Sequence, residues 1–192
     1  MTFVFATNNK FKFHEVKFII SNKIKLISLA DLNFFNEIPE TQSTIEGNAQ
    51  QKATYIYNKF GLNCFADDTG LEIDALNGEP GVYSARYAGK NCSFHDNIIK
   101  VLQKLKNNTN RKARFRTVIS LIEDGKITNF EGIIYGGIIN EFRGKEGFGY
   151  DPVFLPSGYN KTFAEMTTEE KNKISHRAIA IKKLTDYLND KY

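Results

Sequence analysis

The stretch RFRTVISLIEDGKITNFEGIIYGGII, residues 114–139, predicts two β-strands on either side of Asp124-Gly125. Both runs are rich in Val, Ile, Phe, Tyr and Thr, the residues that favour a pleated, half-buried strand. An Asp-Gly pair between two such runs favours a two-residue turn, because both turn positions need a positive φ that Asp and Gly tolerate. The sequence therefore predicts an antiparallel hairpin in the middle of the chain.

On the N-terminal side of this hairpin, strand and helix patterns alternate. An apolar strand is predicted over residues 3–6 and is followed by a helical pattern. A second helix is predicted over residues 44–60, where Gly61 is placed to end it. The run CFADD, residues 64–68, predicts the next strand, which ends in a turn that carries both aspartates.

The C-terminal part adds two more helices and a strand. A third helix is predicted from Ser93, because Asp96 completes a capping box. The run GYDPVFL, residues 149–155, predicts a further strand, and the last helix starts near Ser175. The residues expected to face the core in these two helices are Phe94, Ile98, Leu102, Leu105, Ala178, Ile181, Leu184 and Leu188. Interleaved strands and helices with a central hairpin predict an α/β fold with a mixed sheet.

The composition is that of an ordinary globular chain: of 192 residues, 41% are hydrophobic and 25% are charged. No apolar run approaches the ~20 residues of a membrane-spanning helix, and the N-terminus lacks the pattern of a secretion signal. Cys64 and Cys92 are too few for a disulfide framework or a zinc cluster, so a cytoplasmic location is expected. The net charge of +4 fits a solvated surface, a nucleic-acid partner or a small polyanion such as a nucleotide.

The turn ATNNKFK, residues 6–12, joins the first strand to the first helix. Free backbone N–H groups and the helix dipole attract phosphate at such a position. Thr7 and Asn9 can donate to phosphate oxygens, and Lys10 and Lys12 add positive charge. A helix cap without a ligand is the alternative for this turn.

Asp67 and Asp68 are adjacent carboxylates at the end of an apolar run. They cost free energy there unless a cation or several donors meet them. Carboxylates are ligands that Mg²⁺ prefers, and Glu46 and Glu72 are candidates to join the pair. A solvated turn, shaped by the Thr-Gly that follows, is the alternative.

Two later segments carry further candidates. The run GFGYDPVF, residues 147–154, places an aromatic residue on either side of Gly149, which suits stacking on a nucleobase. A strand with core aromatics is the alternative. The run TTEEKNKISHRAIAIKK, residues 167–183, puts His176 and Arg177 in the first turn of the last helix. Cations there oppose the helix dipole, so either a ligand's acceptor oxygen or solvent must compensate them.

Four segments together resemble the inosine-triphosphate pyrophosphatase family: ATNNKFK, FADDTGLEIDALNGEPGVYSARYAG, GFGYDPVF and TTEEKNKISHRAIAIKKL. They follow the family's order along nearly the whole chain. The resemblance implies one pyrophosphatase domain over residues 1–192, with an elongated mixed β-sheet flanked by helices and two lobes around a central nucleotide-binding cleft. It also implies a homodimer, with no membrane partner and no stable nucleic-acid partner.

The resemblance implies Mg²⁺-dependent hydrolysis of ITP, dITP or XTP to the monophosphate and pyrophosphate, which would remove these nucleotides from the pool. Arg177 and His176 as donors would pair with the 6-keto oxygen of the base but would face the amino group of adenine, leaving buried groups unpaired. A catalytically impaired purine-nucleotide sensor is one alternative. A nucleic-acid-binding protein is another, although no nucleic-acid motif is recognisable.

The resemblance also assigns roles to individual residues. It implies that Asp68 is the general base and a metal ligand, that Asp67 is a second metal ligand and that Lys52 is catalytic. The substrate-binding residues that it implies are Thr7, Asn8, Asn9, Lys10, Phe11, Lys12, Thr69, Phe148, Gly149, Tyr150, Asp151, Lys171, His176 and Arg177.

The chain departs from the family pattern at two positions. Asn8 stands where the family often has glycine, and Asn tolerates left-handed geometry. Gly47 stands where many relatives place a metal-binding Glu beside the following Asn. Glu46, one position earlier, is the candidate to take that role as a metal ligand.

Overall fold

The computed structural model describes residues 1–20 and 23–191. The strands are β1 (Thr2–Phe5), β2 (Lys25–Ile27), β3 (Cys64–Ile73), β4 (Lys112–Glu123), β5 (Lys126–Ile138) and β6 (Phe154–Pro156). The helices are α1 (Lys10–Ile19), α2 (Ile45–Phe60), α3 (Phe94–Lys104), α4 (Thr168–Ile174) and α5 (His176–Lys191). Within the described ranges, no helix is both long enough and apolar enough to cross a membrane.

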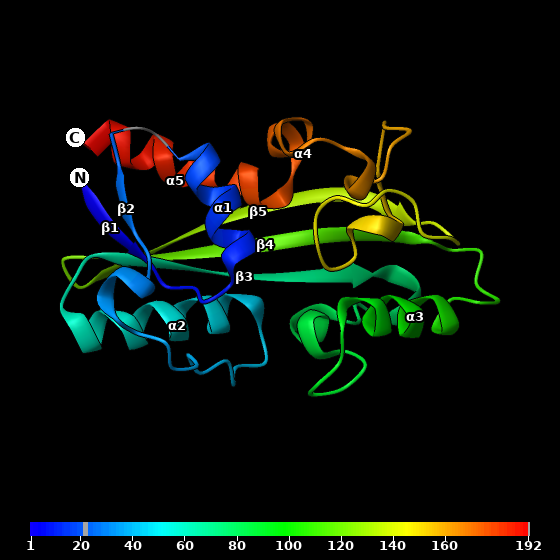
Figure 1. Cartoon of the computed structure of the whole chain (residues 1–192), viewed down its shortest axis with the longest axis horizontal. Helices are drawn as coiled ribbons and strands as arrows, with labels where there is room; N and C mark the ends of the chain where they lie inside the picture. Colours follow the sequence, from blue (N-terminus) through cyan, green and yellow to red (C-terminus); the bar gives the residue numbers. More distant parts are fainter. Residues whose placement is uncertain (21–22, 192) are drawn as a thin grey trace. The chain divides into compact units, whose positions relative to one another are not determined.

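The strands form one six-stranded sheet in the order β2-β1-β3-β4-β5-β6 (Figure 1). β1 pairs in parallel with β2 and with β3, while β5 and β6 pair antiparallel. The sheet is therefore mixed and carries helices, which confirms the predicted α/β class. The predicted hairpin is confirmed as well: β4 and β5 are joined by Asp124 and Gly125, whose φ angles are 49° and 80°.

Asp67 and Asp68 do not lie on a turn. They lie in the middle of β3, a continuous strand of ten residues, so the predicted turn at this point was wrong. Successive side chains of a strand point to opposite faces of the sheet, so the two carboxylates do not have to face one another. The carboxylate of Asp67 pairs with Lys12 and that of Asp68 pairs with Lys52. Because both charges are compensated, the strand can include the two aspartates.

By contacts, the described chain divides into two compact units, here called unit 1 and unit 2. Unit 1 comprises Met1–Asp68, Thr117–Gly132 and Arg177–Tyr192, and unit 2 comprises Thr69–Arg116 and Ile133–His176. Each unit has its own hydrophobic core.

Unit 1 buries apolar side chains on both faces of its strands. One cluster joins Phe5 and Phe65 to α1 and α5, and a second joins Cys64 and Ala66 to α2. Figure 1 accordingly shows α1 and α5 on one side of the strands and α2 on the other. Because residues 65 and 67 share a face, Asp67 points to the side of α1 and α5, and Asp68 points to the side of α2.

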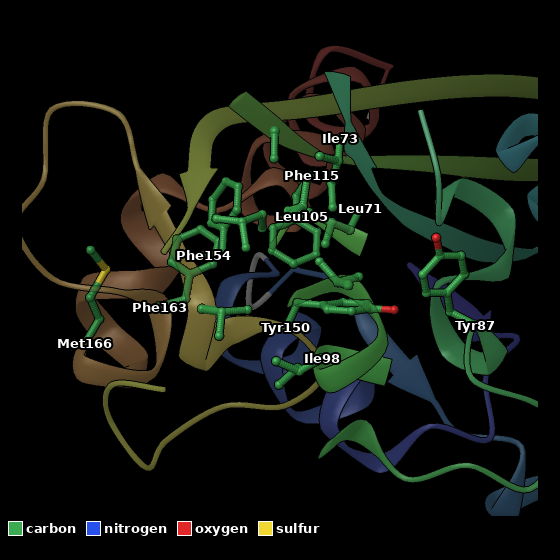
Figure 2. Packing of buried hydrophobic residues seen from close by; sticks show 14 residues of the cluster. Leu71, Ile73, Tyr87, Ile98, Leu105, Phe115, Tyr150, Phe154, Phe163 and Met166 are labelled. Carbon is green, nitrogen blue, oxygen red and sulfur yellow. The ribbon is translucent and has the colours of Figure 1, made fainter. Parts of the chain in front are cut away.

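Unit 2 has an aromatic core. The ring centres of Phe115 and Phe154 are 4.7 Å apart, and those of Phe154 and Phe163 are 5.2 Å apart. Figure 2 shows these three rings together. Ile98 of α3 and Leu105, which follows the end of this helix, belong to the same cluster. The predicted inward position of Phe94 was wrong: this side chain is exposed, and Val101 is buried instead.

Capping residues in the sequence correctly predicted where α2 and α3 begin and where α2 ends. Thr44 caps the start of α2 and Gly61 ends it with a positive φ, as predicted. Ser93 and Asp96 form the predicted capping box of α3. The strand predicted over residues 149–155 was only partly right, because a 3₁₀ turn occupies Asp151–Val153 and the strand begins at Phe154. Pro152 has no N–H to donate to a strand ladder, which accounts for the delayed start.

Candidate functional site

Asp67 is the centre of a buried ion-pair network in unit 1. The ammonium of Lys12, on α1, lies 3.1 Å and 3.0 Å from its two carboxylate oxygens. The guanidinium Nε of Arg177, on α5, donates to the same carboxylate at 3.2 Å. Only 1% of the Asp67 side chain is exposed.

Arg177 has two carboxylate partners, because its Nη1 also donates to Glu15 on α1. The side chain is 1% exposed. These two anions compensate the cation in the first turn of α5, where the helix dipole opposes it. Sequence reasoning missed Glu15, since the pattern of α1 gives it no distinguishing feature.

The cations around Asp67 hold its carboxyl group in the ionised form. Burial alone would raise the pKa of Asp67, but Lys12 and Arg177 outweigh it, and the pKa is lowered from its ordinary value. Burial lowers the pKa of Lys12, and the carboxylate of Asp67 only partly offsets this.

Asp68 has different neighbours, which come from α2. The ammonium of Lys52 lies 3.1 Å from its Oδ1, and the Asn48 side-chain amide donates to its Oδ2 at 3.3 Å. Asn48 and Lys52 are four residues apart and so share one face of the helix. Lys52 also bonds to Glu40, from the segment that precedes α2.

The balance of charge at Asp68 is the reverse of that at Asp67. Burial raises the pKa of Asp68, and the negative charge of Glu40 adds to this effect, while Lys52 and Lys12 only partly offset it. Burial alone would lower the pKa of Lys52, but Asp68 and Glu40 outweigh it, and that pKa is raised. Asp68 is therefore a carboxylate with a strengthened tendency to take up a proton or another cation.

Glu40 is a residue of this site that sequence reasoning did not find. Its segment is held against α2, because the backbone N–H of Gln42 donates to Asn48 Oδ1 at 2.9 Å. A Cβ atom at Gly47 would lie 2.8 Å from the Cβ of Gln42, so the glycine permits this close approach. Nothing in the sequence around Glu40 separates it from Glu37, and only the fold brings it to Lys52.

The donor set at Asp68 fits a hard divalent cation. In the described part of the chain, no group of three or more His, Cys, Asp and Glu side chains could hold a metal ion. Mg²⁺ does not need one, because it is usually bound by one or two carboxylates together with water and substrate phosphates. Asp68 and Glu40 supply two such carboxylates beside Lys52. Glu46 lies in the first turn of α2 and is half-buried, and Glu72 pairs with Arg114 in unit 2.

The comparisons with known proteins identify the family. The model of the Ham1 family matches residues 3–187. The chain belongs to the Ham1 family. This confirms the resemblance seen in the four sequence segments.

Individual members of the Ham1 family are closely similar to this chain. A protein of Flavobacterium johnsoniae named dITP/XTP pyrophosphatase is 53% identical over 188 residues, which cover 98% of each chain. The solved structure of the Staphylococcus aureus Ham1 protein is 41% identical, with a TM-score of 0.91 and 100% of both chains covered. The dITP/XTP pyrophosphatase of Mycobacterium abscessus is 38% identical, with a TM-score of 0.78, over 96% of this chain and 98% of that one.

The N-terminal loop of this Ham1 member is organised as a helix cap. Asn9 caps α1, its side chain accepting from the backbone N–H of Lys12 at 3.1 Å, and its own N–H donates to Thr7 Oγ1 at 3.2 Å. Asn8 donates to the carbonyl of Asn36 and has no positive φ, so this departure from glycine requires no left-handed backbone. Lys10 and Phe11 are exposed.

In unit 2 the predicted nucleotide-binding residues form a second group, built around Asp151. Lys171 of α4 bonds to Asp151 at 2.7 Å, and the backbone N–H of Phe148 donates to the same carboxylate at 2.8 Å. The Lys171 ammonium lies 5.0 Å from the centre of the Phe148 ring. Gly149 has a φ of 63°, a left-handed conformation that differs from the strand predicted to begin at this residue.

Three further predicted residues belong to unit 2. The hydroxyl of Tyr150 donates to the carbonyl of Ser84 at 2.9 Å, and this side chain is buried. His176 stacks on Phe115, with ring centres 4.7 Å apart, and is buried as well. Thr69 is half-buried on β3. The roles of the unit 2 residues in nucleotide binding stay predictions.

Proposed function

We propose that this Ham1-family protein hydrolyses non-canonical purine nucleoside triphosphates, such as dITP and XTP, to the monophosphate and pyrophosphate. The proposal is supported by the relatives that carry the name dITP/XTP pyrophosphatase. Within the site, its main support is Asp68, a carboxylate beside Lys52 whose pKa is raised by burial and by the negative charge of Glu40. A carboxylate of this kind is suited to accept a proton in a reaction.

In this mechanism Asp68 orients the attacking water and takes up its proton as the water attacks the α-phosphorus. The strengthened basicity of Asp68 favours that transfer. The Asn48 amide and the Lys52 ammonium each donate a hydrogen bond to one of its two oxygens. The bond from the α-phosphorus to the bridging oxygen breaks, and pyrophosphate leaves.

The cations of unit 1 offset the negative charge of the phosphates. Lys12 and Lys52 lie on the two sides of the aspartate pair. Fixed cations in a site that excludes water stabilise developing charge without reorganisation. The pKa of Lys12 is lowered by burial, so an anion near this ammonium favours its charged form.

The proposed cofactor is Mg²⁺, for which Asp68 and Glu40 are the candidate ligands in addition to the predicted Asp67 and Glu46. When bound, this ion would neutralise phosphate charge and lower the pKa of a coordinated water. Asp67 already has Lys12 and Arg177 as partners, so we place it second to Asp68 as a ligand.

Base selection by Arg177 and His176 stays a prediction. The guanidinium of Arg177 is engaged by Glu15 and Asp67, so reading a 6-keto oxygen would require a donor beyond those two bonds. Comparison of ITP with ATP tests this part of the proposal. Equal turnover of the two nucleotides would contradict it.

The test of the proposed function is pyrophosphate release from dITP, XTP, ITP, ATP and GTP, with Mg²⁺ and with a chelator. Mg²⁺-dependent release from dITP and XTP, well above that from ATP, is expected. Tight nucleotide binding without turnover would instead indicate a sensor. Strongly salt-dependent binding of nucleic acid, without binding or hydrolysis of free nucleotides, would indicate a nucleic-acid-binding protein.

We further propose that residues 1–192 act as one pyrophosphatase domain and that the protein forms a homodimer. Light scattering on the purified protein measures its mass directly. A mass of one chain of 21.9 kDa would contradict the dimer.

A further inference from the structure

Asn48 lies between the two parts of the unit 1 site. Its Oδ1 accepts from the backbone N–H of Gln42 at 2.9 Å, and its Nδ2 donates to Asp68 Oδ2 at 3.3 Å. The residue is 1% exposed. One buried amide thus connects the segment that carries Glu40 to the carboxylate of Asp68.

The orientation of this amide follows from its partners. A backbone N–H can only donate, so the Asn48 atom facing Gln42 must be the carbonyl oxygen. The NH₂ group therefore faces Asp68 and donates to it. A hydrogen bond from a fixed donor restricts a carboxylate to one rotamer, because it defines where one of its oxygens must lie.

Neighbours of Asn48 on α2 also restrict the position of the segment that carries Glu40, Thr41 and Gln42. Gly47, without a side chain, lets Gln42 approach α2 closely. One turn further along α2, Gln51 holds Thr41 through two bonds of 2.9 Å, one to its backbone N–H and one to its hydroxyl. Lys52 holds the segment at Glu40 as well, so three residues of α2 contact it. Asn48 and Lys52 also contact Asp68, one at each carboxylate oxygen, while Gln51 contacts the segment through Thr41.

From this geometry we propose that Asn48 is a positioning residue, which orients Asp68 by donation while it anchors the segment that bears Glu40. The inference rests on the proposed function of Asp68. It assigns two separate tasks to one side chain. The acceptor oxygen holds the segment, and the donor nitrogen holds the carboxylate.

These tasks can be separated by substitution. Asn48→Asp keeps an acceptor for the Gln42 N–H and removes the donor to Asp68. Asn48→Leu keeps the branched shape and the number of side-chain heavy atoms and removes both contacts. Gln51→Leu is the matched control, because it releases the same segment at Thr41 without touching Asp68.

Each variant is assayed for kcat and KM with dITP and Mg²⁺, and its unfolding is followed in urea. We expect kcat to fall ~10- to 100-fold in both Asn48 variants, the range found when a partner that orients a ligand or catalytic group is removed. KM should change little, and Gln51→Leu should keep both constants near the wild-type values. Near-wild-type kcat in Asn48→Asp would overturn the proposal, because anchoring alone would then suffice.

A crystal structure of Asn48→Leu supplies a readout that does not depend on turnover. We expect the Asp68 side chain to leave its wild-type rotamer or to occupy more than one. An unchanged, single rotamer would overturn the positioning role. Failure of the proposed function is recognised separately, since the wild-type protein would then release no pyrophosphate from any of the nucleotides.

Discussion

Asp67 and Asp68 are adjacent in the chain, chemically identical and both buried, yet their surroundings differ. Asp67 faces α1 and α5 and has two cations, Lys12 and Arg177, so its pKa is lowered. Asp68 faces α2, where Lys52 is shared with Glu40, and its pKa is raised. The two pKa values shift in opposite directions because a strand directs neighbouring side chains to opposite faces of the sheet, where their charged neighbours differ.

From this comparison we predict a mainly structural role for Asp67 and a reactive role for Asp68. A carboxylate with a surplus of cations stabilises the fold in its ionised form. A carboxylate that is desolvated beside another anion is less stable when ionised, and such groups are typical of functional sites. We therefore expect the two aspartates to respond differently to the same substitution.

The largest effect is expected on activity, from Asp68→Asn. Turnover of dITP should fall ~10³-fold, within the range found when a general base is removed. Unfolding in urea should show a smaller change than Asp67→Asn does, because the removal of a group that ionises unfavourably is offset by the loss of one of the two anionic partners of Lys52. Pyrophosphate release close to the wild-type rate would exclude Asp68 from the mechanism.

Asp67→Asn should have its main effect on stability. The substitution leaves Lys12 and Arg177 buried with one anion fewer, and breaking a buried ion pair in this way costs about 3 kcal/mol. The free energy of unfolding, measured in urea, checks this value. Lys173→Ala, in an exposed i,i+4 pair with Glu169, is the control in which little change is expected. If Asp67→Asn were as stable as the wild type, the structural role assigned to Asp67 would be wrong.

Gly47→Glu tests whether the site around Asp68 depends on the position of the segment that bears Glu40. The substitution restores the residue type expected from the family resemblance, but its Cβ would lie 2.8 Å from that of Gln42. Displacement of the segment should cost about 2 kcal/mol, as overpacking does, and should lower kcat. Gln50→Glu, exposed on the same helix, controls for the added charge. A higher kcat in Gly47→Glu than in the wild type would show that catalysis does not depend on the wild-type position of this segment.

The smallest effect is expected in the pH dependence of stability, measured in urea with a chelator present. The lowered pKa of Asp67 stabilises the fold above the pKa of an unfolded Asp, ~3.9, and this contribution is lost as pH falls through the folded pKa. The raised pKa of Asp68 acts in the opposite direction: its contribution is complete below the unfolded pKa and is lost as pH rises through the folded pKa. The deficit of Asp67→Asn should therefore shrink in acid, and any advantage of Asp68→Asn should vanish there. Identical pH profiles for the two variants would remove the distinction.

Short-range signals were sufficient for much of the fold. The hairpin at Asp124-Gly125 and the capped ends of α2 and α3 were predictable, because each depends on residues close together in sequence. β2 and α4 were not predicted, since three and seven residues give too short a pattern.

The site was predictable in part. The family resemblance predicted Asp68, Lys12 and Lys52 as site residues, and the structure places the two lysines beside the aspartate pair. The polarity of Asp67 and Asp68 was interpreted as a turn, because the cations that let a strand accommodate them lie far away in sequence. Arg177, for example, is 110 residues from Asp67. Long-range pairs of this kind leave no local pattern.

The alternation of β3 makes the spacing of its residues as important as their identity. Deleting Cys64, the first residue of β3, would leave the segment FADDTGLEI complete, yet it would shift the strand by one position and turn each carboxylate to the opposite side of the sheet. Natural or engineered changes in chain length should therefore avoid this strand. The exposed loop at Asp124-Gly125 is a better place to insert a tag or a reporter peptide.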